Sequence, residues 1–111
     1  MKKRSLLDRL REKKATQLNT IVGVGWYAPQ DWERVKATAS DSDLLENTFP
    51  EWEAMANENI ALVRATYPNV VKVLIAADEF STWCLVRGRM NNAEARSQFV
   101  LEKMRSSPVS E

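Results

Sequence analysis

The chain has 111 residues, of which 44% are hydrophobic and 28% charged, and a net charge of +1. These values are typical of one small globular domain and exclude wholesale disorder. No apolar run approaches the roughly 20 residues that span a bilayer, and we expect no secretory signal. Histidine is absent. Because histidine is the commonest general base and transition-metal ligand, we expect no catalytic triad, no metal site and no cofactor.

The small net charge hides a strong division along the chain. Residues 1–20 carry seven basic and two acidic side chains, whereas residues 21–80 carry four basic and ten acidic ones. The basic arm consists of Lys2, Lys3, Arg4, Arg9, Arg11, Lys13 and Lys14. This asymmetry predicts an arm that associates with acidic partners.

The first predicted element is a helix over residues 5–18. Ser5 and Asp8, three positions apart, suggest a weak capping box. Its apolar stripe consists of Leu6, Leu7, Leu10 and Leu18. We interpret the stripe as a surface that packs on the body of the protein or on a partner. An alternative is weak, salt-sensitive contact of the arm with nucleic acid or an anionic membrane surface, without base stacking, because the arm has no aromatic residue.

Residues 20–27 alternate as a strand that carries a G-x-G-x-x-A pattern beginning at Gly23. A dinucleotide-binding loop would begin its helix at the second glycine, Gly25. Trp26 and Tyr27 stand there instead, and the chain supplies only about one βαβ unit. The pattern therefore favours a packing role, in which missing side chains let a helix or a ligand approach the strand.

The rest of the chain alternates helical patterns with one more strand. The expected elements are a helix over 29–39, a helical turn at Leu44 and Leu45, a helix over 49–66 capped by Thr48 and Glu51, a strand over 70–75, a helix over 78–87 capped by Asp78 and closed by Gly88, and a helix from Asn91 or Asn92 to about 105. Strands joined by a long helical crossover are expected to be parallel.

These elements predict a helix-rich α/β fold. It consists of a two-stranded parallel sheet with a helical crossover and flanking helices, preceded by a basic N-terminal helix. We divide the chain into an arm over residues 1–19, a single α/β domain over 20–106 and a disordered tail over 107–111.

Parallel strands end at the same edge of a sheet, and ligands of open α/β sheets bind beyond their carboxyl ends. The residues that follow the two strands form a candidate rim of Trp26, Tyr27, Asp31, Trp32, Asp78, Glu79 and Trp83. One interpretation is a cleft whose carboxylates transfer protons or bind a hard cation. The other is that the carboxylates are ordinary helix-terminal residues and the rings fill the core.

The single cysteine, Cys84, cannot form an internal disulfide, which fits a reducing cytoplasm. A reactive thiol needs an exposed, electropositive setting. The position of Cys84 beside Trp83, one turn after Phe80, indicates a buried structural cysteine instead.

Two motifs resemble a group of small bacterial proteins without an assigned activity. The motifs are W-Y-x-P-x-x-W, formed by Trp26, Tyr27, Pro29 and Trp32, and D-E-F-x-x-W-C over residues 78–84. The resemblance covers residues 20–102 and leaves the basic arm outside. It implies a bacterial cytoplasmic setting.

From the sequence we expect a cytoplasmic protein-interaction or regulatory module that acts by binding, without catalysis, and forms a homodimer or binds another protein. A small ligand-binding protein or enzyme that uses the rim is the alternative. A weak, non-specific nucleic-acid binder is the third hypothesis.

Overall fold

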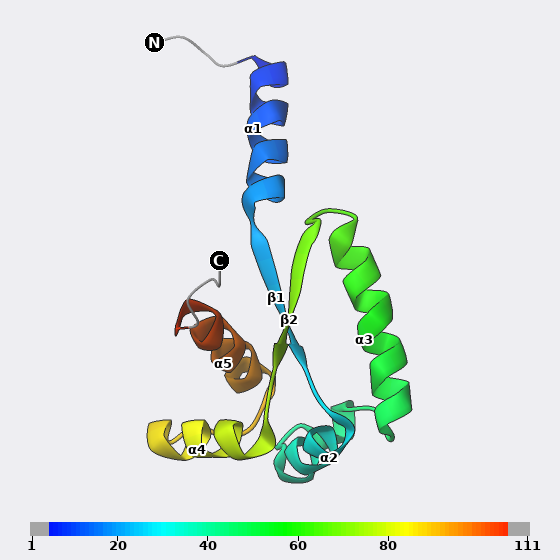
Figure 1. Ribbon diagram of the computed structural model, residues 1–111, viewed down its shortest axis with the longest axis vertical. Helices are drawn as coiled ribbons and strands as arrows, with labels where there is room; N and C mark the ends of the chain where they lie inside the picture. The colour runs from blue at the N-terminus through cyan, green and yellow to red at the C-terminus, as the bar shows by residue number, and fades with distance from the viewer. Residues whose placement is uncertain (1–4, 107–111) are drawn as a thin grey trace.

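The computed structural model describes residues 5–106, which form five α-helices, one 3-10 turn and a two-stranded parallel sheet (Figure 1). The elements are α1 (Leu6–Asn19), β1 (Ile21–Trp26), α2 (Pro29–Thr38), η1 (Ser42–Leu44), α3 (Phe49–Arg64), β2 (Asn69–Leu74), α4 (Ala77–Arg87) and α5 (Ala93–Ser106). The predicted helix-rich α/β fold, led by a basic helix, is confirmed. The predicted tail over 107–111 lies outside the described residues.

Local signals set most helix ends. The Ser5 hydroxyl accepts a hydrogen bond from the backbone N–H of Asp8 (3.1 Å) at the start of α1. At α3 the Thr48 hydroxyl accepts from the backbone N–H of Glu51 (3.3 Å), as the predicted capping box requires, and donates to the Glu51 carboxylate (3.0 Å). Gly88 ends α4 with a φ of 61°, a left-handed conformation that favours glycine.

The start of α4 differs from the prediction. Asp78 does not cap this helix, because the helix already begins at Ala77 and its N-cap is Ala76, which has no capping side chain. The Asp31 carboxylate accepts a hydrogen bond from the backbone N–H of Ala77 (3.1 Å) instead. A residue of α2 thus satisfies the free amide of α4 and joins the two helices that follow the strands.

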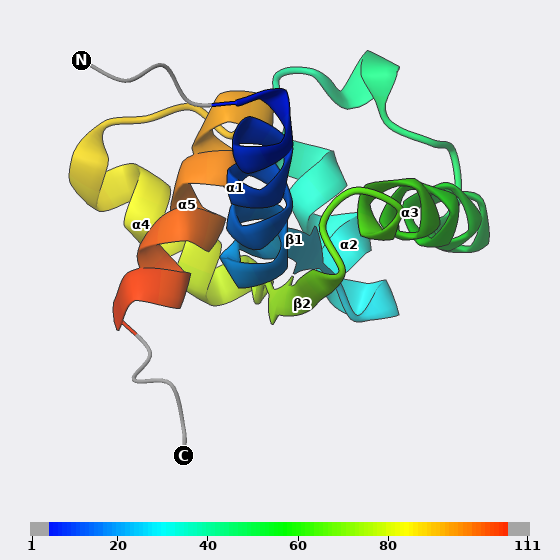
Figure 2. The same ribbon diagram turned by 90° about the horizontal axis from the view of Figure 1, so that it is seen from above.

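The sheet lies between α3 and α5, which flank the strand pair on opposite sides in both views (Figures 1 and 2). Gly23 and Gly25 of β1 bring α5 close to the strand. A Cβ atom on Gly25 would lie 2.8 Å from Ile75 Cδ1 and 3.3 Å from Val100 Cγ2, and one on Gly23 would overlap the Met104 sulfur. Both glycines have ordinary negative φ angles. The two glycines therefore serve close packing, because the absence of a Cβ atom admits the side chains of α5 and Ile75, as the packing interpretation predicted.

Aromatic rings dominate the core. Trp52 of α3 contacts the rings of Trp26 and Tyr27 edge-on, with centroids 4.9 and 5.0 Å apart. A second group joins α4 to α5 through Phe80, Trp83 and Phe99. The largest fully buried side chains are Trp32, Phe80 and Ile75. These rings fix the helices on the small sheet, since aromatic side chains bury the largest areas.

Candidate functional site

The two strands end side by side, as predicted, because Trp26 pairs with Leu74 in the parallel register. The aromatic part of the candidate rim then turns toward α3. Tyr27 and Trp32 are buried in the core, and Trp26 is partly buried against Trp52. These rings serve packing.

Each carboxylate of the rim has a partner of its own within the fold. Asp78 forms an ion pair with Arg34 of α2, and Glu79 forms one with Lys103 of α5 at 2.7 Å. Asp31 holds the start of α4. No hydrogen bond or ion pair links these carboxylates to one another within residues 5–106, so the structure does not gather them into one acidic site.

Trp83, the last rim residue, lies on α4 and faces α5. Its indole N–H donates to the Glu102 carboxylate (3.1 Å), which also accepts from Arg87 (2.6 Å). The hydrogen bond from Trp83 is the main reason why the pKa of Glu102 is lowered. Across the described part of the chain, no group of three or more Asp, Glu or Cys side chains is placed to hold a metal ion.

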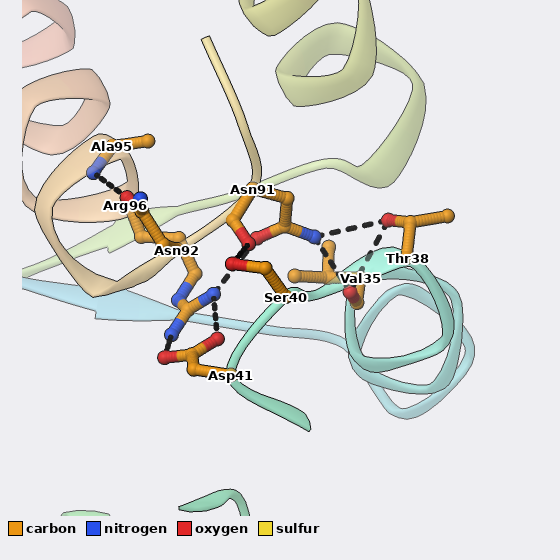
Figure 3. Close-up of polar contacts among 8 residues, drawn as sticks. All are labelled: Val35, Thr38, Ser40, Asp41, Asn91, Asn92, Ala95 and Arg96. Carbon is orange, nitrogen blue, oxygen red and sulfur yellow. Dashed lines mark hydrogen bonds and ion pairs between the residues drawn. The ribbon is translucent and has the colours of Figure 1, made fainter. Parts of the chain in front are cut away.

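A polar cluster that the sequence did not reveal joins the loop after α2 to the start of α5 (Figure 3). Arg96 binds both carboxylate oxygens of Asp41, at 3.1 and 2.6 Å, and donates to the Asn91 side-chain oxygen (2.8 Å). The Asn91 amide in turn donates to the Val35 carbonyl (2.7 Å) and the Thr38 hydroxyl (3.0 Å). Arg96 and Asp41 are 55 residues apart in sequence. No local pattern could therefore have predicted their pairing.

The charges of this cluster influence Tyr27. Burial raises the pKa of its phenol to about 12, and the nearby Arg96 only partly opposes that effect. The phenol is therefore neutral at physiological pH, which does not suit a general base. The Arg96 side chain lowers the pKa of Asp41, so the pair stays ionised.

A cleft of about 640 Å³ lies between α3 and α5. Its lining comprises Gly23, Gly25, Tyr27, Trp52, Met55, Asn59, Ile75, Ala93, Arg96, Ser97, Val100 and Leu101. Most of these side chains are apolar, and the one cation among them, Arg96, is paired with Asp41. The cleft thus offers apolar walls and access to the backbone of β1 between two glycines.

The helix α1 stands apart from the rest of the protein (Figure 1). It has no buried residue, and the exposed fractions of Leu6, Leu7 and Leu10 are 66, 56 and 54%. Its end is fixed by the Asn69 amide, which donates to the Leu18 carbonyl. Of the two predicted positions for the leucine stripe, packing on the body is therefore wrong. Lys2, Lys3 and Arg4 lie outside the described residues.

Cys84 is buried in α4 as a free thiol, which confirms its predicted placement. Burial raises the pKa of the thiol, and Arg89 and Arg96 oppose that effect only in part. A raised pKa keeps the thiol protonated and weakly nucleophilic.

Comparison of the sequence with protein-family models, with curated proteins and with solved structures gives no match. Within residues 5–106, none of the helices has the length and apolar character that a membrane crossing requires.

Proposed function

We propose that this chain is a protein-interaction module that forms a homodimer through α1. The observation that carries the proposal is the leucine stripe of α1, whose four leucines are 49 to 66% exposed, in a helix that has no buried residue. An isolated helix of 14 residues is marginally stable in water. A partner that buries the stripe would stabilise it.

The charges of α1 indicate the kind of surface it binds. At about 100° per residue, the four leucines occupy one third of the helix circumference, and Lys14 falls within the same arc. Arg11 and Lys13 border this arc, whereas Asp8 and Glu12 face the opposite side. Two α1 helices packed through their leucines would therefore place like charges together. An acidic acceptor is favoured instead.

The acidic acceptor in a second copy is the outward face of α3. Ala54, Glu58 and Ala61 lie four and three residues apart on this exposed face, and Glu51 and Leu62 lie beside them. Leu62 is 72% exposed. Small side chains admit a neighbouring helix closely, and the glutamates complement the cations of α1. Residues 41–60 contain six acidic side chains and no Lys or Arg.

The lengths of the two helices also match, at 14 residues for α1 and 16 for α3, or about 21 and 24 Å. In a two-fold dimer each copy would place its α1 on the α3 of the other, which gives two equal interfaces. Exposed ion pairs contribute little, about 0–1 kcal/mol each. Burial of the leucines must therefore supply most of the affinity.

Sedimentation at about 100 micromolar protein, in low and in high salt, tests the dimer. We expect a dimer that high salt weakens without abolishing it. The variant Leu6→Gln/Leu7→Gln/Leu10→Gln removes three of the four leucines of the stripe, retains helix propensity and should be monomeric. The control Ala15→Gln/Thr16→Gln/Asn19→Gln changes the opposite face and should remain dimeric. A monomer at both ionic strengths, or a dimer that the leucine variant retains, would refute the proposal.

A charge exchange tests the acceptor surface. Lys13→Glu/Lys14→Glu and Glu51→Lys/Glu58→Lys should each weaken the dimer, and their mixture should restore it. If the arm instead binds duplex DNA or anionic vesicles while the protein stays monomeric, the arm has a different partner and the proposal is wrong.

The alternative site at the rim receives less support, because Asp31, Asp78 and Glu79 each have a partner within the fold. We also propose a reducing compartment, such as the bacterial cytoplasm, for this module. The buried free thiol of Cys84 and the resemblance of residues 20–102 to small bacterial proteins support that setting.

A further inference from the structure

The two-stranded sheet has two free edges, and the hydrogen bonds between the strands identify which backbone groups face each edge. The Trp26 carbonyl accepts from the backbone N–H of Ile75 (2.8 Å), in register with Leu74. Backbone N–H and C=O groups alternate in direction along a strand, so those of Val22 and Val24 also point toward β2. The N–H and C=O groups of Gly23 and Gly25 therefore point to the free edge of β1.

The free edge of β2 is protected. The same alternation directs the Leu74 carbonyl outward, where it accepts a hydrogen bond from Lys103 Nζ (3.2 Å). Lys103 therefore occupies an outward carbonyl that an added strand would need for its own backbone hydrogen bond.

The free edge of β1 lacks such protection. Gly23 and Gly25 line the cleft between α3 and α5. Outside the ladder of β1 and β2, no backbone hydrogen bond among residues 5–106 involves either glycine. Met104, Ile75 and Val100 fill the space that Cβ atoms would take at these glycines, so the groups that remain toward the cleft are the outward N–H and C=O groups. We propose that this edge binds an extended peptide segment of another protein as a third strand.

The cleft has a volume of about 640 Å³. An added strand lies about 4.8 Å from its neighbour, and four extended residues span about 13 Å. The two walls would contact alternate side chains of the peptide, Trp52 and Met55 from α3 and Val100 and Leu101 from α5. Because these walls are apolar and Arg96 is already paired with Asp41, the preferred segment is uncharged with small or apolar side chains. Backbone hydrogen bonds supply affinity in this mode, and the side chains supply specificity.

A second copy of the chain is a poorer occupant than a peptide. Its own β1 lies at the bottom of the same cleft, between α3 and α5, and cannot reach into another cleft. The Leu74 carbonyl on its β2 edge is already bound by Lys103. This inference is independent of the proposed dimer, which uses α1.

The test uses a synthetic acetyl-Val-Thr-Val-Thr-Val-amide peptide and follows the backbone amides of Gly23 and Gly25 by NMR. We expect bound peptide to slow hydrogen exchange at both glycines by at least tenfold. A peptide N-methylated at alternate residues retains one hydrogen-bonding edge and should still bind, whereas a fully N-methylated peptide should not. The variant without the leucine stripe of α1 should bind the peptide normally.

Two exposed leucines provide a matched pair of variants. Leu101→Glu places a charge on the cleft wall and should weaken binding at least tenfold, whereas Leu85→Glu on α4, away from the cleft, should have no effect. Unchanged exchange at both glycines with about 1 mM peptide would overturn the inference. So would equal binding of the fully N-methylated peptide, or protection of the glycines that rises with protein concentration alone.

Discussion

The helices α1 and α3 differ in length by two residues, and both carry apolar residues at helical spacing, yet only one is part of the core. α3 buries Trp52, Ala56 and Ile60, whereas α1 buries nothing. Amphipathic spacing therefore predicts that a helix has a contact face, but it does not tell whether the partner belongs to the same chain. That difference separates the body, whose helices bury side chains against one another, from α1, for which we propose a partner in a second copy.

The largest expected effect is the loss of an aromatic ring from α3. Trp52→Ala removes a buried side chain that touches Trp26, Tyr27 and Phe49, and should lower the free energy of unfolding by about 3–5 kcal/mol. Leu10→Ala in α1 should change it by less than about 0.5 kcal/mol. Urea denaturation at low protein concentration measures both. Equal losses would show that α1 belongs to the core.

Tyr27 gives the body a sensitivity to alkali that α1 cannot share. Its pKa is raised from 10 to about 12 by burial, so the native state keeps the proton longer than the unfolded chain. This difference in pKa contributes about 3 kcal/mol in total to the free energy of unfolding. The contribution is complete below pH 10 and is lost as the pH rises toward 12. Tyr27→Phe should lack this part of the alkaline loss in pH-dependent urea denaturation. Parallel curves for both proteins would contradict the prediction.

The ion pair between Asp41 and Arg96 should have an intermediate effect. Asp41→Asn leaves the mostly buried Arg96 without its carboxylate and should cost about 2 kcal/mol. Arg96 lowers the pKa of Asp41 in the native state. The contribution of the ion pair to the free energy of unfolding is therefore present above the unfolded pKa of about 3.9, and it is lost as the pH falls through the lower pKa of the native state. Asp43→Asn, two residues away and exposed, is the matched control and should be neutral.

The sequence predicted those features that depend on neighbouring residues. The capping box of Thr48 and Glu51 and the β-branched run of β2 identify their elements because the interactions are local. The cap of α4 by Asp31 and the pairing of Asp41 with Arg96 join residues 46 and 55 positions apart, so no local pattern contains them.

The candidate site was predictable to a similar extent. The parallel strands and their common end followed from the helical crossover between them. The direction of the side chains beyond that end could not be predicted from the sequence, because it depends on Arg34 of α2 and Lys103 of α5, which pair with Asp78 and Glu79. The open edge of β1 likewise depends on which helices flank it.

The smallest effect on folding is expected from removal of the first part of α1. Among the described residues, a chain lacking residues 1–14 loses no buried side chain, so its free energy of unfolding at low protein concentration should change by less than about 0.5 kcal/mol. At high concentration the outcome should differ, because a dimer stabilises the native state by mass action. The melting temperature of the full chain should then rise with concentration, while that of the shortened chain stays constant. A shortened chain that no longer folds would place the leucines of α1 in the core. If the melting temperature of the full chain does not change with protein concentration, α1 does not form the proposed dimer.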